Sequence, residues 1–178
     1  MDGHPGRTPR RLVLHKTTAF TESELQGVRD ATQAIKEVEC LEVGAGGAWR
    51  GVWMVDAPGK EPPIQAHGYP VPRGTMVMTT GTSCLLWVAG NAPAATSGRD
   101  FFQGGKSIPK PIVLRRHMGR GLFDILALEA IALAKMDWNN DALYDPVPVT
   151  IMYSQRLSRI ISNVQRLPGS AYPYRLFM

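Results

Sequence analysis

Residues 12–20 read Leu-Val-Leu-His-Lys-Thr-Thr-Ala-Phe, an apolar run that changes abruptly into a polar turn. Three consecutive apolar residues with a β-branched valine among them predict a central strand that is covered on both faces. Thr21 follows with Glu24 three residues later, and this spacing predicts a capping box at the start of a helix that continues to about Lys36. Because only residues 1–11, which are mostly polar, precede the strand, we expect its sheet to be incomplete in this chain.

The rest of the chain alternates between short apolar runs and turns. Residues 58–74 are rich in Pro and Gly and are predicted to form a surface loop. The order of elements predicts an α/β domain over residues 12–178, a mixed sheet with flanking helices, after a polar lead-in over residues 1–11. Strands are expected at residues 38–43, 49–55, 75–80, 83–89 and 111–115, and helices at residues 121–138 and 149–167.

Composition excludes several classes of protein. The chain has 178 residues, of which 44% are hydrophobic, and this balance is typical of a globular domain. No apolar run approaches the ~18 residues that a membrane-spanning helix needs, and the basic N-terminus has no apolar segment of a secretory signal. Cys40 and Cys84 are far apart and lack metal-ligand spacing, so we expect reduced core cysteines in a cytoplasmic protein.

The net charge of +5 is unevenly distributed, which is more informative than its size. Two stretches contain basic residues and no acid, one between Asp100 and Asp124 and one after Asp145. They indicate two surfaces that face phosphate, although a solvated basic face without a partner would have the same composition. The basic residues are Lys106, Lys110, Arg115, Arg116, His117 and Arg120 in the first stretch, and Arg156, Arg159, Arg166 and Arg175 in the second.

Four segments resemble, in the same order, parts of the Piwi domain of prokaryotic Argonautes. Residues 12–20 resemble a strand-to-helix segment, and residues 102–109, Phe-Gln-Gly-Gly-Lys-Ser-Ile-Pro, resemble a Gln-Gly loop beside the nucleic-acid channel. Residues 132–140 and 148–154 are similar to a helix end and to the start of the last helix. The resemblance is to the C-terminal portion of the domain and implies a partial ribonuclease H-like Piwi fold that lacks the first strands.

The resemblance also implies a catalytically inactive type. Active relatives place three acids and a fourth residue, His or Asp, around two divalent ions, which need carboxylate oxygens. The third acid aligns with Lys16 and the fourth residue with Gln155, whereas the first two acids would lie upstream of residue 1. We therefore expect neither an enzyme nor a catalytic metal. Lys16 could instead contact phosphate in the vacated site, or it could be a solvent-facing lysine at a strand end.

Nucleic-acid contacts are expected from basic residues on the loop, the following strand and the last helix. Arg115 and Arg116 would point to opposite faces of a strand, so only one of them can line a channel. Backbone N–H groups beside Arg120, at a helix start, could also receive phosphate. The resemblance implies Mg²⁺ at the guide 5′-phosphate, near the carboxylate of Met178, if a Mid domain is present. The expected contacts are Lys106, Lys110, Arg115, Arg116, Arg120, Tyr153, Arg156 and Arg159.

The function expected is a nucleic-acid-binding module of an Argonaute-like protein of prokaryotic defence, which holds the guide and target backbone without cleaving it. Guide and target could be RNA or DNA, and an upstream Argonaute half or an associated effector protein is the expected protein partner. One alternative is a metal-dependent ribonuclease H-like nuclease built on acids such as Asp137, Asp141 and Asp145. Another is a split-gene fragment that acts only by association with another chain.

Overall fold

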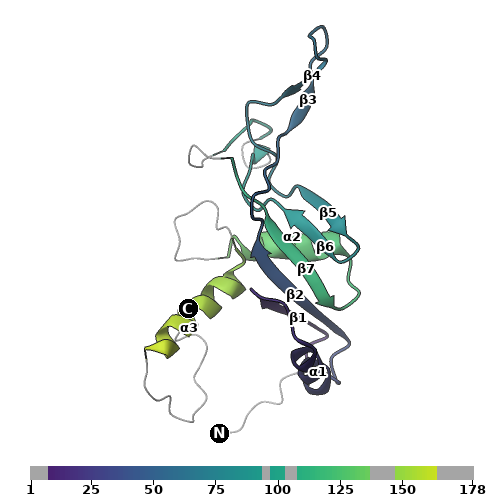
Figure 1. Cartoon of the computed structure of the whole chain (residues 1–178), viewed down its shortest axis with the longest axis vertical. Coiled ribbons are helices and arrows are strands. Elements are labelled where there is room, and N and C mark those ends of the chain that lie inside the picture. Colours follow the sequence, from purple (N-terminus) through teal and green to yellow (C-terminus); the bar gives the residue numbers. More distant parts are fainter. Residues whose placement is uncertain (1–7, 94–96, 103–107, 137–146, 164–178) are drawn as a thin grey trace.

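The computed structural model describes residues 8–93, 97–102, 108–136 and 147–163, and its centre is a five-stranded mixed sheet (Figure 1). The strand order is β1-β2-β7-β6-β5, in which β1 and β2 are parallel and all other neighbours are antiparallel. The predicted mixed sheet with flanking helices is therefore confirmed. The strands are β1 (Arg11–Lys16), β2 (Glu37–Ala45), β5 (Met76–Thr80), β6 (Ser83–Leu86) and β7 (Ile112–Met118).

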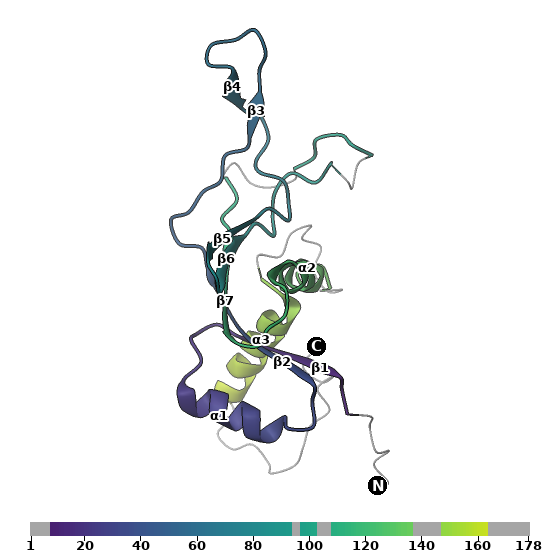
Figure 2. The same ribbon diagram turned by 90° about the vertical axis from the view of Figure 1, so that its right-hand side faces the viewer.

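Helices lie on both faces of the sheet. α1 (Glu22–Ala31) covers one face, and α2 (Phe123–Leu133) and α3 (Val149–Ser162) lie on the other, as the view along the sheet shows (Figure 2). The main core forms between the sheet and α2, where Leu86 and Leu114 are fully buried against Phe123. This burial of aliphatic side chains is the largest favourable contribution to the fold.

β1 is the outer strand of the described sheet, although its sequence predicts a central strand. Its side chains alternate between two apolar clefts: Leu12 and Leu14 face α1, whereas Val13 and His15 face α2 and α3. All six of its residues are only half-buried. The strand is thus covered on both faces as predicted, but one edge has no neighbouring strand among the described residues.

α1 begins with the predicted capping box. The Thr21 hydroxyl accepts from the Glu24 backbone N–H, and the Glu24 carboxylate accepts from the Thr21 N–H at 2.8 Å. The helix ends at Ala31 and not at Lys36 as predicted, because the C-cap residue Thr32 has a non-helical backbone (φ −113°, ψ 18°) and the Ile35 N–H donates to the Thr32 carbonyl in a turn. The chain then turns so that β2 can begin beside β1.

α2 is shorter and less buried than its apolar sequence predicts. One face packs on the sheet through Phe123, Leu126 and Ala130, whereas Leu128 on the opposite face is 63% exposed. Leu122, which precedes the helix, is 72% exposed. A sequence that is apolar almost all round predicts a helix buried on most sides. In the structure, Ile125 and Leu128 are exposed, so α2 is buried on one face.

A hairpin projects from the end of the sheet (Figure 1). It pairs β3 (Met54–Asp56) with β4 (Ile64–Ala66) in antiparallel register. The strand predicted over residues 49–55 is therefore mostly irregular, and the loop predicted over residues 58–74 contains β4. We call residues 46–73 the hairpin lobe. It joins the sheet where Gly51 approaches the indole of Trp87 so closely that a side chain at this position would clash.

Candidate nucleic-acid interface

The two adjacent arginines of β7 point to opposite faces of the sheet, as strand alternation predicts. Arg115 lies on the α1 side, where its guanidinium is 3.3 Å from the Glu42 carboxylate and its side chain is about half exposed. Arg116 lies on the α2 side, donates to the Gly121 carbonyl and covers the Phe123 ring at 4.8 Å. Arg115 is thus the one of the two that reaches solvent, whereas Arg116 stabilises the connection between β7 and α2.

The Glu42 carboxylate also binds His117 on the same face. His117 Nε2 lies 2.8 Å from Glu42 Oε2, and the His117 ring packs 5.7 Å from the Phe20 ring. The sequence predicts that His117 is either a phosphate neighbour or simply exposed, whereas the structure shows a largely enclosed imidazole with an anionic partner. One carboxylate therefore offsets part of the positive charge on this strand.

The loop before α2 carries Arg120, whose side chain is exposed. Two backbone donors of this loop are already paired. The N–H groups of Arg120 and Gly121 both donate to Glu39 Oε1, the first at 2.9 Å, and Glu39 is 3% exposed. α2 itself begins after them, at Phe123, so the N–H groups at the helix start stay a predicted phosphate site.

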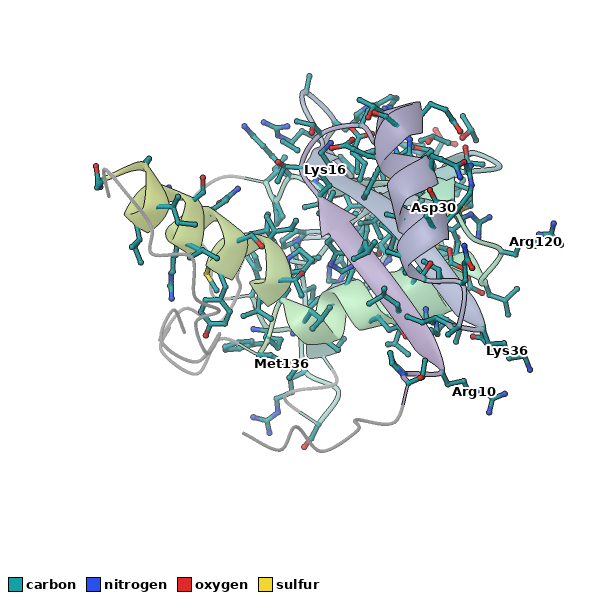
Figure 3. The ribbon with its side chains drawn as sticks, turned by 90° about the horizontal axis from the view of Figure 1, so that it is seen from below. Arg10, Lys16, Asp30, Lys36, Arg120 and Met136 are labelled. Atoms are coloured by element: carbon teal, nitrogen blue, oxygen red, sulfur yellow. The ribbon has the colours of Figure 1, made fainter. Side chains whose placement is uncertain are left out.

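Arg120 nevertheless belongs to a group of cations at one end of the sheet. Lys36 and Arg120 line the same cleft, and Arg10 adjoins them because its carbonyl accepts from the Glu37 N–H at 3.2 Å. Figure 3 shows Arg10, Lys36 and Arg120 projecting outward on the same side of the molecule. No sequence pattern combines Arg10 with Lys36, since their proximity follows from the parallel register of β1 with β2.

Lys16 lies at the other end of β1, on the α1 side of the sheet (Figure 3). Its ammonium group is 2.6 Å from both oxygens of Glu24, donates to the Ala19 carbonyl and lies 5.4 Å from the Phe20 ring centroid. The hydrogen bond from Lys16 lowers the pKa of Glu24 to about 2. Lys16 is thus a partly exposed lysine at the end of β1 whose ammonium group is paired with α1.

His15, the neighbour of Lys16, faces α3 instead. Its Nδ1 is 2.8 Å from the hydroxyl of Thr150 in the first turn of that helix. Burial lowers the pKa of His15, so the neutral imidazole is favoured at neutral pH. At the start of β1, Arg11 makes a bidentate ion pair with Glu129 of α2. These contacts give His15 and Arg11 structural roles, because they hold β1 to both helices.

α3 leaves the core after its first turn, since only Val149 and Ile151 of this helix are buried. Gln155 and Arg159 are exposed, and Arg156 lies over the Tyr153 ring at 5.4 Å. The guanidinium groups of Arg120 and Arg159 have no partner among the described residues. Tyr153, Arg156 and Arg159 therefore share one projecting helix, and Arg159 has its charge most freely available.

The remaining expected positions are placed only in part. Lys110 is exposed just before β7 begins. Lys106, the Asp137–Asp145 turn and Met178 lie outside the described residues. In the part of the chain that is described, no three His, Cys, Asp or Glu side chains gather closely enough to hold a metal ion. The same part contains no helix with the length and hydrophobicity to cross a membrane.

Both cysteines are buried and unpaired, as predicted. Burial raises the pKa of Cys40 and raises that of Cys84 to about 11. Because the thiolate is the reactive form, these residues are inert side chains of the core.

Solved structures of Argonautes are similar to this chain. A crystal structure of Aa-Ago with externally bound siRNA superimposes with a TM-score of 0.61 at 13% identity, covering 91% of this chain and 19% of that one. Aquifex aeolicus Argonaute matches with a TM-score of 0.59 at 13% identity, covering 89% of this chain and 19% of that one. Clostridium butyricum Argonaute bound to a guide DNA and a 19-mer target DNA matches with a TM-score of 0.52 at 13% identity, over 85% and 17% of the two chains.

The likeness is one of structure, because no model of a protein family matches the sequence and no curated protein is similar to it. The chain spans about a fifth of the length of the Aquifex proteins that it matches, 19% in each. The chain therefore has an Argonaute-like, Piwi-like fold.

Proposed function

We propose that this chain is the C-terminal part of a Piwi domain in an Argonaute-like protein and holds the backbone of a guide–target duplex without cleaving it. The observation that carries the proposal is the structural likeness to Argonautes over 91% of the chain. One of the similar structures holds a guide DNA with its target DNA. The two basic, acid-free stretches of the sequence supply the charge that such a partner needs.

Contacts to phosphate would come from the exposed cations. Lys110, Arg115 and Arg120 lie on β7 or beside its ends, and Arg159 extends along α3. Phosphate contacts position a strand and carry no sequence information, so base pairing between guide and target would supply the specificity. Binding by this chain alone is therefore expected to be nonspecific and strongly dependent on salt.

The absence of cleavage is proposed from the chemistry of two positions. Where the resemblance places metal-binding acids, this chain has the ammonium group of Lys16 and the neutral amide of Gln155. An ammonium group repels a divalent ion, and Lys16 is already paired with Glu24. These residues do not fit a pair of divalent ions, so no reaction step is assigned to them.

Other partners belong to the same proposal. Anchoring of a guide 5′-phosphate would need a Mid domain from an upstream Argonaute half, and Mg²⁺ would then bind near the carboxylate of Met178. One edge of β1 has no neighbouring strand among the described residues, which is compatible with such a half. We place the protein in the cytoplasm, where it would meet guide, target and any effector protein of a prokaryotic defence system.

Binding measured at several salt concentrations tests the proposal. Labelled RNA and DNA duplexes are titrated with the wild-type chain and with Arg120→Ala and Arg159→Ala, and anisotropy reports the affinity. Each substitution should lower the slope of log affinity against log salt by about one, because it removes one phosphate contact. Arg29→Ala is the matched control, because Arg29 is paired with Glu22 on α1.

The same preparations separate binding from cleavage. Incubation with a guide, a matched target, and Mg²⁺ or Mn²⁺ should leave the target intact. Metal-dependent cleavage that disappears in a variant of this chain would show a nuclease and reject the second half of the proposal. An affinity that stays flat from low to high salt would reject the first half.

A further inference from the structure

The base of the hairpin lobe contains an apolar cleft that the contacts proposed above do not use. The cleft has a volume of about 500 Å³, which is within the range of ligand sites in proteins. Val52, Trp53, His67 and Tyr69 of the lobe line it, together with Phe102 and Ile108 from a segment far along the sequence. Two separate parts of the chain thus build one concave surface.

Three of the lining side chains form a continuous aromatic wall. The ring centroids of Trp53 and His67 are 4.1 Å apart, and those of His67 and Tyr69 are 5.9 Å apart. Tyr69 is 41% exposed, so its ring is open to a ligand. A planar ring can stack on such a wall, which is how proteins bind unpaired bases without reading their sequence.

One ring of this wall, that of His67, is held by polar contacts. His67 Nε2 lies 3.5 Å from Asp100, and Asp100 accepts from the amide of Asn91 at 2.6 Å. Asn91 is fully buried, and its side-chain oxygen accepts from the Phe101 N–H at 2.7 Å. Because the His67 ring is already held in place, it would need little ordering when a ligand binds.

Charge next to the cleft favours a nucleic acid over a protein segment. Arg50 adjoins the lining residue Gly51 and donates only to backbone carbonyls, so its charge has no described anionic partner. Lys110 follows Ile108 by two residues and is exposed. Asp100, the acid beside the cleft, is bound to Asn91 and His67. Aromatic rings next to cations are the usual combination for binding single strands.

From this geometry we propose that the cleft takes an unpaired base of a single-stranded nucleic acid, with the adjoining phosphates near Arg50 and Lys110. This inference rests on the proposed function and adds a second class of substrate, a single strand that lies outside any guide–target duplex. The base stacks on Tyr69 and His67, and the contact tolerates any base because every base has a π face.

The test compares a single strand with a duplex in variants of the full chain. A labelled homopyrimidine strand and a blunt duplex of equal length are titrated with the wild-type chain, Tyr69→Ala and Tyr69→Phe. Tyr69→Ala should weaken strand binding by roughly 5- to 150-fold, the equivalent of ~1–3 kcal/mol per stacked base, and leave duplex binding unchanged. Tyr69→Phe keeps the ring and should retain wild-type affinity. Met54→Ala is the control, because Met54 is 51% exposed on the same hairpin and does not line the cleft.

Photo-crosslinking locates the base directly. A strand that carries 5-iodouracil should crosslink to the peptide containing Tyr69, and a crosslink confined to other peptides would overturn the inference. An equal loss of strand and duplex binding in Tyr69→Ala would also overturn it. If Tyr69→Ala instead weakens a proline-rich test peptide and spares the strand, the cleft is a protein-docking site and the inference is wrong.

The wild-type measurements separate the two proposals. If the wild-type chain binds neither duplex nor strand, the proposed function itself fails. If it binds the duplex as expected while Tyr69→Ala leaves strand binding unchanged, only the assignment of the cleft fails.

Discussion

The five-stranded sheet with its helices, here called the sheet body, and the hairpin lobe both contain large apolar side chains. Many of these side chains are buried in the sheet body, and several are exposed in the lobe. In the body, Leu86 and Leu114 are fully buried between the sheet and α2. In the lobe, Trp49 and Ile64 remain largely exposed, and the two short strands are held by backbone hydrogen bonds such as that from Ala57 N–H to the Pro63 carbonyl. The buried apolar side chains of the body stabilise the fold, whereas the exposed apolar surface of the lobe is available to a ligand.

The largest expected effect comes from the body. Leu114→Ala should lower the free energy of unfolding by about 2–5 kcal/mol, because it removes buried methyl groups and leaves a cavity. Ile64→Ala in the lobe should change it by less than about 0.5 kcal/mol, since this side chain is already exposed. Urea unfolding of both variants measures the difference, and equal losses would show that the lobe belongs to the same core.

A substitution where the hairpin lobe joins the sheet body should lower the free energy of unfolding by a smaller amount. A Cβ at position 51 would lie 2.8 Å from Val71 Cγ1 and 3.0 Å from Trp87 Cζ2. Gly51→Ala should therefore cost about 1–3 kcal/mol through overpacking. Gly68→Ala is the matched control, because a Cβ there meets no atom within 4 Å. Equal melting temperatures of the two variants in thermal unfolding would contradict close packing at Gly51.

A substitution at the N-cap of α1, on the surface of the sheet body, should have the next smaller effect on stability. Thr21→Ala removes the side-chain cap of α1 and should cost about 1 kcal/mol, whereas Thr21→Ser keeps the accepting oxygen and should cost less. Chemical unfolding of both variants checks the order. If Thr21→Ser is as damaging as Thr21→Ala, the methyl group and not the hydrogen bond is responsible.

The smallest expected effect is a change in stability that depends on pH. Hydrogen bonds from the Lys16 ammonium, the largest cause, and from Thr21 lower the pKa of Glu24 from its ordinary value of 4.5 to about 2. A lowered carboxyl pKa stabilises the fold above the unfolded value, and this contribution is lost as the pH falls from about 4.5 through about 2. The stability difference between wild type and Glu24→Gln should therefore shrink over this window. A Glu24 titration, followed by NMR, that is the same in Lys16→Met would exclude Lys16 as the cause.

Local patterns predicted those parts of the fold that depend on neighbouring residues. The capping box at Thr21 and the opposite directions of Arg115 and Arg116 follow from helix and strand periodicity, and both are confirmed. The helix ends were wrong, because α1 stops where the Thr32 backbone leaves the helical conformation and the chain turns, before the apolar pattern ends.

Features that depend on register or distant contacts could not be predicted in this way. The approach of Arg10 to Lys36 requires the parallel pairing of β1 with β2. The aromatic wall joins Trp53 with His67 across a hairpin whose second strand has only three residues, too few to show a period. Glu39 looked like an ordinary strand residue, because the loop that it binds lies about 80 residues later, at Arg120.

Glu39 has a consequence for how any polyanion could cross the start of α2. Its carboxylate accepts from the N–H groups of Arg120 and Gly121, which lie just before Leu122, the N-cap of α2. In the proposed complex, phosphate contacts at this end would therefore come from the side chains of Arg10, Lys36 and Arg120 and not from these two main-chain donors. Such side-chain contacts can be removed by substitution one residue at a time.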